Sequence, residues 1–167
     1  CYTGGFTVSA LQGGASSVLA VDASAEALRQ AEAHVRLNQL DPARTVFQEG
    51  DVFQVLRGLR DRRSSFDMII LDPPKFAQSA SQVERAARGY KDINLLAFKL
   101  LRPGGLLVTF SCSGGIDADL FQKIVAGAAL DAGVEAQIVE HLHQGPDHPV
   151  ALNFPEGAYL KGLVTLT

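Results

Sequence analysis

The sequence predicts an α/β fold in which a mostly parallel sheet carries helices on both faces. Three observations support this prediction. Short apolar runs that end in acids or glycines alternate along the chain with segments of helical length. The runs are nearly uninterrupted, as in parallel strands that are buried on both faces. The last run, 158–167, follows a long polar loop and fits an antiparallel closing strand.

Six strands are expected, and most end at residues that stop a sheet ladder. The run "SVLAVD" (17–22) is apolar up to its terminal acid. The run "FDMIILDPP" (66–74) must end at its prolines, because proline has no N–H to donate to the ladder. The run "LLVTFSCS" (106–113) leads into two glycines. The other expected strands are 45–51, 135–142 and 158–167.

Four helices are expected between these strands. The segment 24–40 begins with Ser24 as an N-cap, its apolar residues recur at helical spacing, and His34 lies on its solvated face. The segment 118–133 ends at a glycine, which favours the left-handed conformation of a helix C-terminus. We expect "PGG" (103–105) to separate the last of the other helices from the strand after it. Those other helices are 52–63 and 83–101.

Composition and charge restrict the classes of protein to which the chain can belong. It has 167 residues, of which 47% are hydrophobic and 20% charged, and this suits one globular domain rather than a disordered chain. Its net charge of −3 gives no overall attraction for nucleic acid, so RNA binding needs a local patch or a further domain. No apolar run approaches the roughly 18 residues of a membrane span.

The cysteines and histidines indicate a reducing compartment and no metal. Cys1 and Cys112 are too few for the disulfide framework of a secreted domain, so a cytoplasmic protein is expected. The histidines at 141, 143 and 148 lack the ligand spacing of a metal site. The opening "CYTGGF" resembles the middle of a fold, and we therefore expect a fragment whose first strand lies upstream.

Chemically versatile side chains stand at the carboxyl ends of four expected strands. They are Asp22, Asp51, Asp72 and Cys112. Ligands of open α/β sheets bind outside the carboxyl ends of the strands. The sequence therefore predicts one site at this edge, with three carboxylates and one thiol.

Part of this edge suits a nucleotide-like ligand. Adjacent Gly4 and Gly5 let a ligand approach the backbone closely, and Asp22 can accept both hydroxyls of a ribose. Asp51 can accept from an amine such as that of adenine, while the Val52 amide can meet a ring nitrogen. The glycines do not form the G-x-G-x-x-G fingerprint of nicotinamide folds. The alternatives are a simple turn at the glycines and helix caps at the acids.

The segment "LDPPKF" (71–76) and Cys112 suggest chemistry at the same edge. Two prolines stiffen the strand exit and hold the Asp72 carboxylate as a rigid acceptor for a planar base, and Lys75 suits a phosphate. A thiolate is a strong nucleophile, and a nearby cation such as Lys75 promotes its formation. The alternatives are a structural proline turn and a cysteine that only fills space.

The helix expected after this turn offers further contacts for RNA. Arg88 and Lys91 can reach phosphates, although an ordinary solvent-facing role fits them equally well. Phe76 and Tyr90 are candidates to stack on an exposed or flipped base.

Together these motifs resemble those of class I S-adenosylmethionine-dependent methyltransferases, which have a Rossmann-like sheet. "YTGGF" resembles their glycine-rich first motif, "VDAS" the acidic motif after it, "GDVF" the adenine-contacting segment and "DPPK" the fourth motif. More narrowly, "RGYKDIN", "TFSCSG" and "PEGAYLKG" resemble the catalytic domain of large-subunit (23S) ribosomal RNA 5-methylcytosine methyltransferases, which carry an N-terminal PUA domain.

The resemblance implies S-adenosylmethionine as the cofactor and 23S ribosomal RNA as the partner. It implies that Cys112 is the nucleophile and that Asp72, the second catalytic residue, binds the amino edge of cytosine. The candidate RNA contacts are Pro74, Lys75, Arg88 and Lys91. The candidate cofactor contacts are Tyr2, Thr3, Gly4, Gly5, Asp22, Ser24, Asp51 and Val52.

The resemblance also implies that residues 1–167 are a catalytic-domain fragment without its upstream RNA-binding domain. The family's first strand would precede Cys1 and lie between the strands that end at Asp22 and Asp72. Many other RNA 5-methylcytosine enzymes have a second cysteine where this chain has Lys75. The sequence therefore assigns no base for the proton at carbon 5, and it assigns no oligomeric state.

Three alternatives remain open from the sequence. A methyltransferase could act on another RNA base or on a small molecule, with Cys112 only structural. A nicotinamide-dependent reductase would use the same acid, Asp22, at the end of the strand after the glycines, but this chain lacks the G-x-G-x-x-G fingerprint of such enzymes. A non-catalytic RNA-binding module is disfavoured by the net charge of −3.

Overall fold

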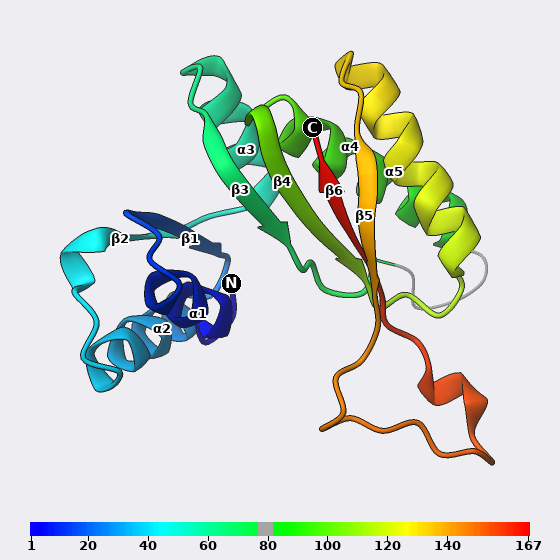
Figure 1. Cartoon of the computed structure of the whole chain (residues 1–167), viewed down its shortest axis with the longest axis horizontal. Helices are drawn as coiled ribbons and strands as arrows, with labels where there is room; N and C mark the ends of the chain where they lie inside the picture. The colour runs from blue at the N-terminus through cyan, green and yellow to red at the C-terminus, as the bar shows by residue number, and fades with distance from the viewer. Residues whose placement is uncertain (77–81) are drawn as a thin grey trace. The chain divides into compact units, whose positions relative to one another are not determined.

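The computed structural model describes residues 1–76 and 82–167, which form two compact units, Cys1–Gly58 and Leu59–Thr167 (Figure 1). The elements of the first unit are α1 (Gly5–Gln12), β1 (Val18–Asp22), α2 (Ala25–Leu37), a 3-10 turn (Pro42–Arg44), β2 (Thr45–Glu49) and the beginning of α3 (Val52–Asp61). The elements of the second unit are β3 (Phe66–Leu71), α4 (Val83–Phe98), β4 (Leu101–Ser111), α5 (Ala118–Ala132), β5 (Gln137–Leu142), a 3-10 turn (Pro155–Gly157) and β6 (Lys161–Leu166).

In the first unit, β1 and β2 pair in parallel, so that Asp22 lies opposite Glu49. Their carboxyl ends therefore lie at the same edge. The expected helix 24–40 is confirmed as α2, whose first turn is capped by the Ser24 side chain accepting from the Ala27 amide. Helix α1 was not predicted, because the glycine-rich segment before it gave no helix start signal.

In the second unit, four strands form a sheet in the order β3-β4-β6-β5. Strand β3 is parallel to β4, while β6 is antiparallel to both of its neighbours. The predicted antiparallel last strand is therefore confirmed. Helices α4 and α5 run along one face of this sheet (Figure 1). Large buried side chains from α4, β4 and α5, among them Phe98, Leu107 and Phe121, form the core.

The segment "PGG" differs from its predicted role as a break. Helix α4 ends earlier, at Phe98, and β4 already begins at Leu101. The Gly104 amide donates to the Thr167 carbonyl (2.7 Å), and the Thr167 amide donates to the Gly105 carbonyl (3.0 Å). Because the irregular backbone at Gly104 (φ 77°) is paired with the last strand, it forms part of the sheet.

The predicted class, an α/β fold with a mostly parallel sheet and an antiparallel last strand, is confirmed. The strands nevertheless form two sheets, and among the described residues β1 pairs only with β2 and β3 only with β4. Several predicted boundaries shift by one to three residues: β3 ends at Leu71 rather than at the prolines, and β6 begins at Lys161 rather than at 158.

Candidate functional site

The adjacent glycines before α1 have different surroundings. Gly4 has φ of 85°, and a Cβ added to it would lie 2.7 Å from the Cβ of Ala31 on α2. Packing against α2 therefore already requires glycine at this position. A Cβ added to Gly5 would meet no heavy atom within 4 Å. Gly5, the first residue of α1, is therefore the one of the pair that borders open space.

The Asp22 carboxylate at the end of β1 holds the segment before these glycines. Oδ2 accepts from the amino group of Cys1 (2.9 Å) and from the Tyr2 amide (2.7 Å), and Oδ1 accepts from the Ser24 amide (3.0 Å). Partial burial alone raises the pKa of Asp22, but these hydrogen bonds outweigh it and bring the pKa to about 2. At neutral pH the group is an ionised acceptor, which suits a hydroxyl ligand.

His34 was expected only on the solvated face of its helix, and this expectation missed a contact. Its Nδ1 lies 2.8 Å from the Thr3 carbonyl oxygen. Since a carbonyl can only accept, Nδ1 carries the hydrogen. His34 thus fixes Thr3 to α2, and no spacing signal in the sequence connects two residues so far apart.

Asp51 acts as a helix cap in the structure, as one of the sequence alternatives held. Its Oδ1 accepts from the Gln54 amide (3.0 Å) at the start of α3, where Val52 is the first helical residue. The Gly50 amide donates to the Asp22 carbonyl (3.0 Å), so the ends of β1 and β2 are tied together. The first amides of a helix have no partner within it, which leaves the Val52 amide suited to a ligand.

The segment after β3 presents its polar residues to solvent. Asp72, Pro74 and Lys75 are exposed by surface area, yet enough protein surrounds the Asp72 carboxylate that partial desolvation raises its pKa. The Phe76 ring packs on the Tyr90 ring, with centroids 4.6 Å apart. Tyr90 is fully buried, so the prediction that it stacks on a base is wrong, whereas Phe76 is half-buried.

Cys112 follows β4 on a short segment that is anchored on both sides. The thiol is free and half-buried, while Ser111 and Ser113 are fully buried. The Ser113 amide donates to Ser111 Oγ (3.3 Å), and Ser113 Oγ shares a hydrogen bond of 3.1 Å with the Tyr90 hydroxyl. The two serines are thus polar anchors, and the cysteine between them is held in a fixed place.

Lys161, the first residue of β6, belongs to the motif "PEGAYLKG", and the sequence predicts no role for it. Its ammonium donates to the Ser113 carbonyl oxygen (2.8 Å), which also accepts from the Ile116 amide (3.1 Å). Burial lowers the pKa of Lys161, and its interaction with Cys112 opposes this effect. One signal was available: Lys161 is the only lysine or arginine after Lys123.

The two basic candidates on α4 make contacts within the protein. Arg88 is exposed and lies 3.6 Å from Glu84, one turn earlier on the same helix. Lys91 pairs with Asp131 (2.8 Å) and so ties α4 to the C-terminal end of α5. Asp131 lies about four turns along α5 from Asp117, at the other end of that helix.

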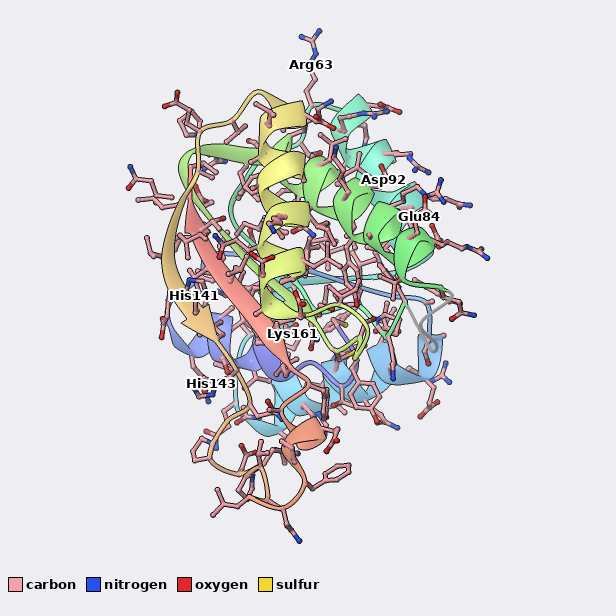
Figure 2. All side chains as sticks on the ribbon, turned by 90° about the vertical axis from the view of Figure 1, so that its right-hand side faces the viewer. Arg63, Glu84, Asp92, His141, His143 and Lys161 are labelled. Atoms are coloured by element: carbon pink, nitrogen blue, oxygen red, sulfur yellow. The ribbon has the colours of Figure 1, made fainter. Side chains whose placement is uncertain are left out.

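Metal-binding clusters and membrane-spanning helices are both absent from the described residues. No group of three or more His, Cys, Asp or Glu side chains there could hold a metal ion. Figure 2 labels His141 on β5 and His143 just beyond it. No helix of the described residues is long and apolar enough to cross a membrane.

The ionised Asp22 carboxylate and the glycine-rich turn beside it suit a ligand that carries ribose hydroxyls. The family model of S-adenosylmethionine-dependent methyltransferases matches residues 1–164. The chain therefore belongs to this family, whose methyl donor is S-adenosylmethionine. This membership decides against the nicotinamide-dependent reductase.

Curated relatives are closely similar to the chain. The protein named ribosomal RNA large subunit methyltransferase I from Tolumonas auensis is 60% identical over 164 residues, which cover 98% of this chain and 41% of that protein. The protein of the same name from Escherichia coli O139:H28 is 56% identical over 161 residues, which cover 96% of this chain and 41% of that protein. The chain thus spans about two fifths of the length of these relatives.

Solved structures confirm the fold. SMU.776, assigned as a methyltransferase and crystallised with SAH, matches 97% of this chain and 42% of its own with a TM-score of 0.83 and 23% identity. NSun6 from Pyrococcus horikoshii, crystallised with SFG, matches 99% of this chain and 45% of its own with a TM-score of 0.68 and 19% identity. At these identities the likeness concerns the fold alone.

Proposed function

We propose that the chain is the catalytic region of a cytoplasmic enzyme that methylates carbon 5 of a cytosine in large-subunit (23S) ribosomal RNA through a Cys112 thiolate adduct. The observation that supports this most directly is the fixed, half-buried thiol between two fully buried serines, one of which accepts a hydrogen bond from the Lys161 ammonium at its carbonyl oxygen. The names of relatives at 56–60% identity support ribosomal RNA as the substrate.

The residues of the first unit fit the methyl donor. Open space at Gly5 admits a ligand close to the start of α1, and the ionised Asp22 carboxylate can accept a ribose hydroxyl at Oδ1. Asp51 and the Val52 amide would hold the adenine, while Tyr2, Thr3, Gly4 and Ser24 shape the loop that surrounds it. The donor, when bound, supplies an electrophilic methyl carbon on a sulfonium.

Cys112 would begin the reaction, because carbon 5 of cytosine is a poor nucleophile. The thiolate adds to carbon 6, the 5,6 double bond opens, and its electron pair makes carbon 5 nucleophilic. Carbon 5 then takes the methyl group from the sulfonium, which becomes a neutral thioether. A base removes the proton from carbon 5, the 5,6 double bond re-forms and Cys112 leaves as the thiolate.

Asp72 would hold the cytosine during these steps. Desolvation raises its pKa and so brings the carboxyl group closer to the protonated form. The group can then exchange a proton with the ring-nitrogen and amino edge of the cytosine, or form a strong hydrogen bond to it, as charge develops there. Pro74 and Lys75 continue the same exposed segment and would meet the sugar and phosphate. Arg88 and Lys91 remain candidates for more distant phosphates.

Methyl transfer from labelled S-adenosylmethionine to unmodified ribosomal RNA by the full-length protein, followed by nucleoside analysis, tests the reaction. Label in 5-methylcytidine is expected, and label in another nucleoside would refute the assigned base. Cys112→Ala is expected to lower the rate by at least about a thousandfold without weakening binding of the donor. Substantial activity in that variant would refute the covalent mechanism.

An RNA that carries 5-fluorocytidine at the target gives a direct test of the adduct. Fluorine cannot leave carbon 5 as a proton does, so the wild-type protein is expected to remain bound covalently to this RNA after methyl transfer. Cys112→Ser is the matched control, because it preserves the size of the side chain and removes the thiolate. A covalent complex that persists in this variant would place the adduct on another residue.

A further inference from the structure

Lys161 lies beside the segment that carries Cys112. It is the first residue of β6 and sits opposite Ser111 in the antiparallel pair of β4 and β6. Figure 2 labels it at the start of its strand, on the side where α5 begins. Since Ser111 directly precedes Cys112, the strand register places this lysine beside the segment that carries the thiol.

The ammonium group of Lys161 is held by a neutral oxygen rather than by a carboxylate. It donates to the Ser113 carbonyl at 2.8 Å, and it forms no ion pair with the described residues. Asp117, an acid that also attracts it, is exposed and already accepts from the Leu120 amide (2.8 Å) as the cap of α5. Lys75 adds a repulsive charge from the segment after β3.

A half-buried cation with no fixed counter-ion gains most from an anion that forms next to it. The thiolate of Cys112 is such an anion, and the attraction acts equally on both partners. It opposes the effect of burial on the pKa of Lys161. Lys75 is exposed to solvent, so screening weakens any similar effect from its charge.

We propose that Lys161 is a positioning residue for Cys112, which fixes the Ser113 carbonyl on one side of the thiol and stabilises the thiolate by its charge. The inference rests on the proposed function, in which that thiolate is the nucleophile. Lys161 itself need not touch the RNA or the methyl donor. Its role is to hold the nucleophile in place and to stabilise the thiolate that attacks.

The rate at which iodoacetamide alkylates Cys112, measured across pH by peptide mass spectrometry of the full-length protein, tests this directly. Lys161→Met is expected to move the midpoint of the rate profile up by about one pH unit and to slow alkylation at neutral pH about tenfold. Lys161→Arg keeps the charge and is expected to restore most of the rate. Lys99→Met, at an exposed lysine after α4, is the matched control and is expected to change nothing.

The outcomes separate this inference from the proposed function. An unchanged alkylation profile in a Lys161→Met protein with a wild-type thermal transition would overturn the role of Lys161. If that variant unfolds, the alkylation profile of Lys161→Arg is compared with that of the wild type instead. A retained profile supports a role for the positive charge at this position, and a profile shifted to higher pH contradicts that role. Full methylation by Cys112→Ala would instead refute the covalent mechanism, whatever the alkylation profiles show.

Discussion

The two adjacent glycines before α1 have opposite requirements, and alanine at each position separates folding from ligand binding. At Gly4, alanine must adopt φ of 85° and place its Cβ 2.7 Å from Ala31 Cβ and 3.0 Å from Ala31 Cα. The left-handed conformation costs about 1–2 kcal/mol. The clash with a helix backbone that cannot move aside adds about 1–3 kcal/mol. We therefore expect Gly4→Ala to lower the free energy of unfolding by about 3 kcal/mol.

At Gly5 the same substitution meets no atom within 4 Å and lies at the first position of a helix. Gly5→Ala is therefore expected to leave the stability unchanged or to raise it by about 0.5 kcal/mol. Its methyl group would instead project into the space left for the donor, so it is expected to weaken binding of S-adenosylhomocysteine, the product form of the donor.

Thermal unfolding and calorimetric titration of both variants check this pair. A loss of about 3 kcal/mol corresponds to a fall in Tm of about 6–12 °C for a domain of this size. Gly4→Ala should show that fall, whereas Gly5→Ala should show a weaker titration at an unchanged Tm. Equal thermal shifts in the two variants, or an unchanged Tm in Gly4→Ala, would refute the assignment of packing to one glycine and ligand space to the other.

Three further predictions concern single polar contacts. Asp22→Asn is expected to cost about 1–2 kcal/mol of stability at pH 7. Because the Ser24 and Tyr2 amides help to lower the pKa of Asp22 in the folded state below its ordinary value of 3.8, its contribution is complete above that value and is lost as pH falls below it. Urea unfolding of wild type and variant should therefore converge in acid. Tyr90→Phe removes the hydroxyl that is hydrogen-bonded to Ser113 and is expected to lower the free energy of unfolding by about 1 kcal/mol. It is also expected to slow alkylation of Cys112 and methylation of the RNA. A change in stability alone would contradict the anchoring role of Tyr90. Arg88→Ala is expected to weaken RNA binding and to lower the slope of its salt dependence by the release of about one counter-ion. Lys91→Ala is expected to have a smaller effect, because the Lys91 ammonium is paired with Asp131. Equal effects of the two variants on RNA binding would contradict this ranking.

The fold class could be predicted because each strand carries its own local signal. The apolar run Val18–Asp22 ends in an acid, and Phe66–Leu71 is followed by prolines, which stop a ladder because they have no N–H to donate. The role of "PGG" could not be predicted in this way. Its backbone is paired with Thr167, and no local pattern shows that pairing.

In the candidate site too, positions that follow from chain order could be predicted, whereas contacts between distant elements could not. The placement of Asp22, Asp51, Asp72 and Cys112 at the carboxyl ends of their strands follows from chain order. In the structure Asp22 is the last residue of β1, Asp51 lies two residues after β2, and Asp72 and Cys112 directly follow β3 and β4. The contacts of Lys161 with Ser113 and of His34 with Thr3 join elements that are distant in sequence. They depend on strand register and helix packing, which composition and spacing do not encode.

The serines on either side of Cys112 explain why a thiol stands at the end of a central strand. A buried hydroxyl costs free energy unless it is hydrogen-bonded, so a sequence that only filled space would have used alanine. Here Ser113 is hydrogen-bonded to Tyr90 of α4 through its hydroxyl and to Lys161 of β6 through its carbonyl oxygen. The Ser111 hydroxyl oxygen accepts from the Ser113 amide. Three elements therefore fix the backbone on both sides of one half-exposed sulfur. A residue that only fills space does not need a fixed backbone. A nucleophile does, because the motion already lost in the folded protein need not be lost again when it attacks.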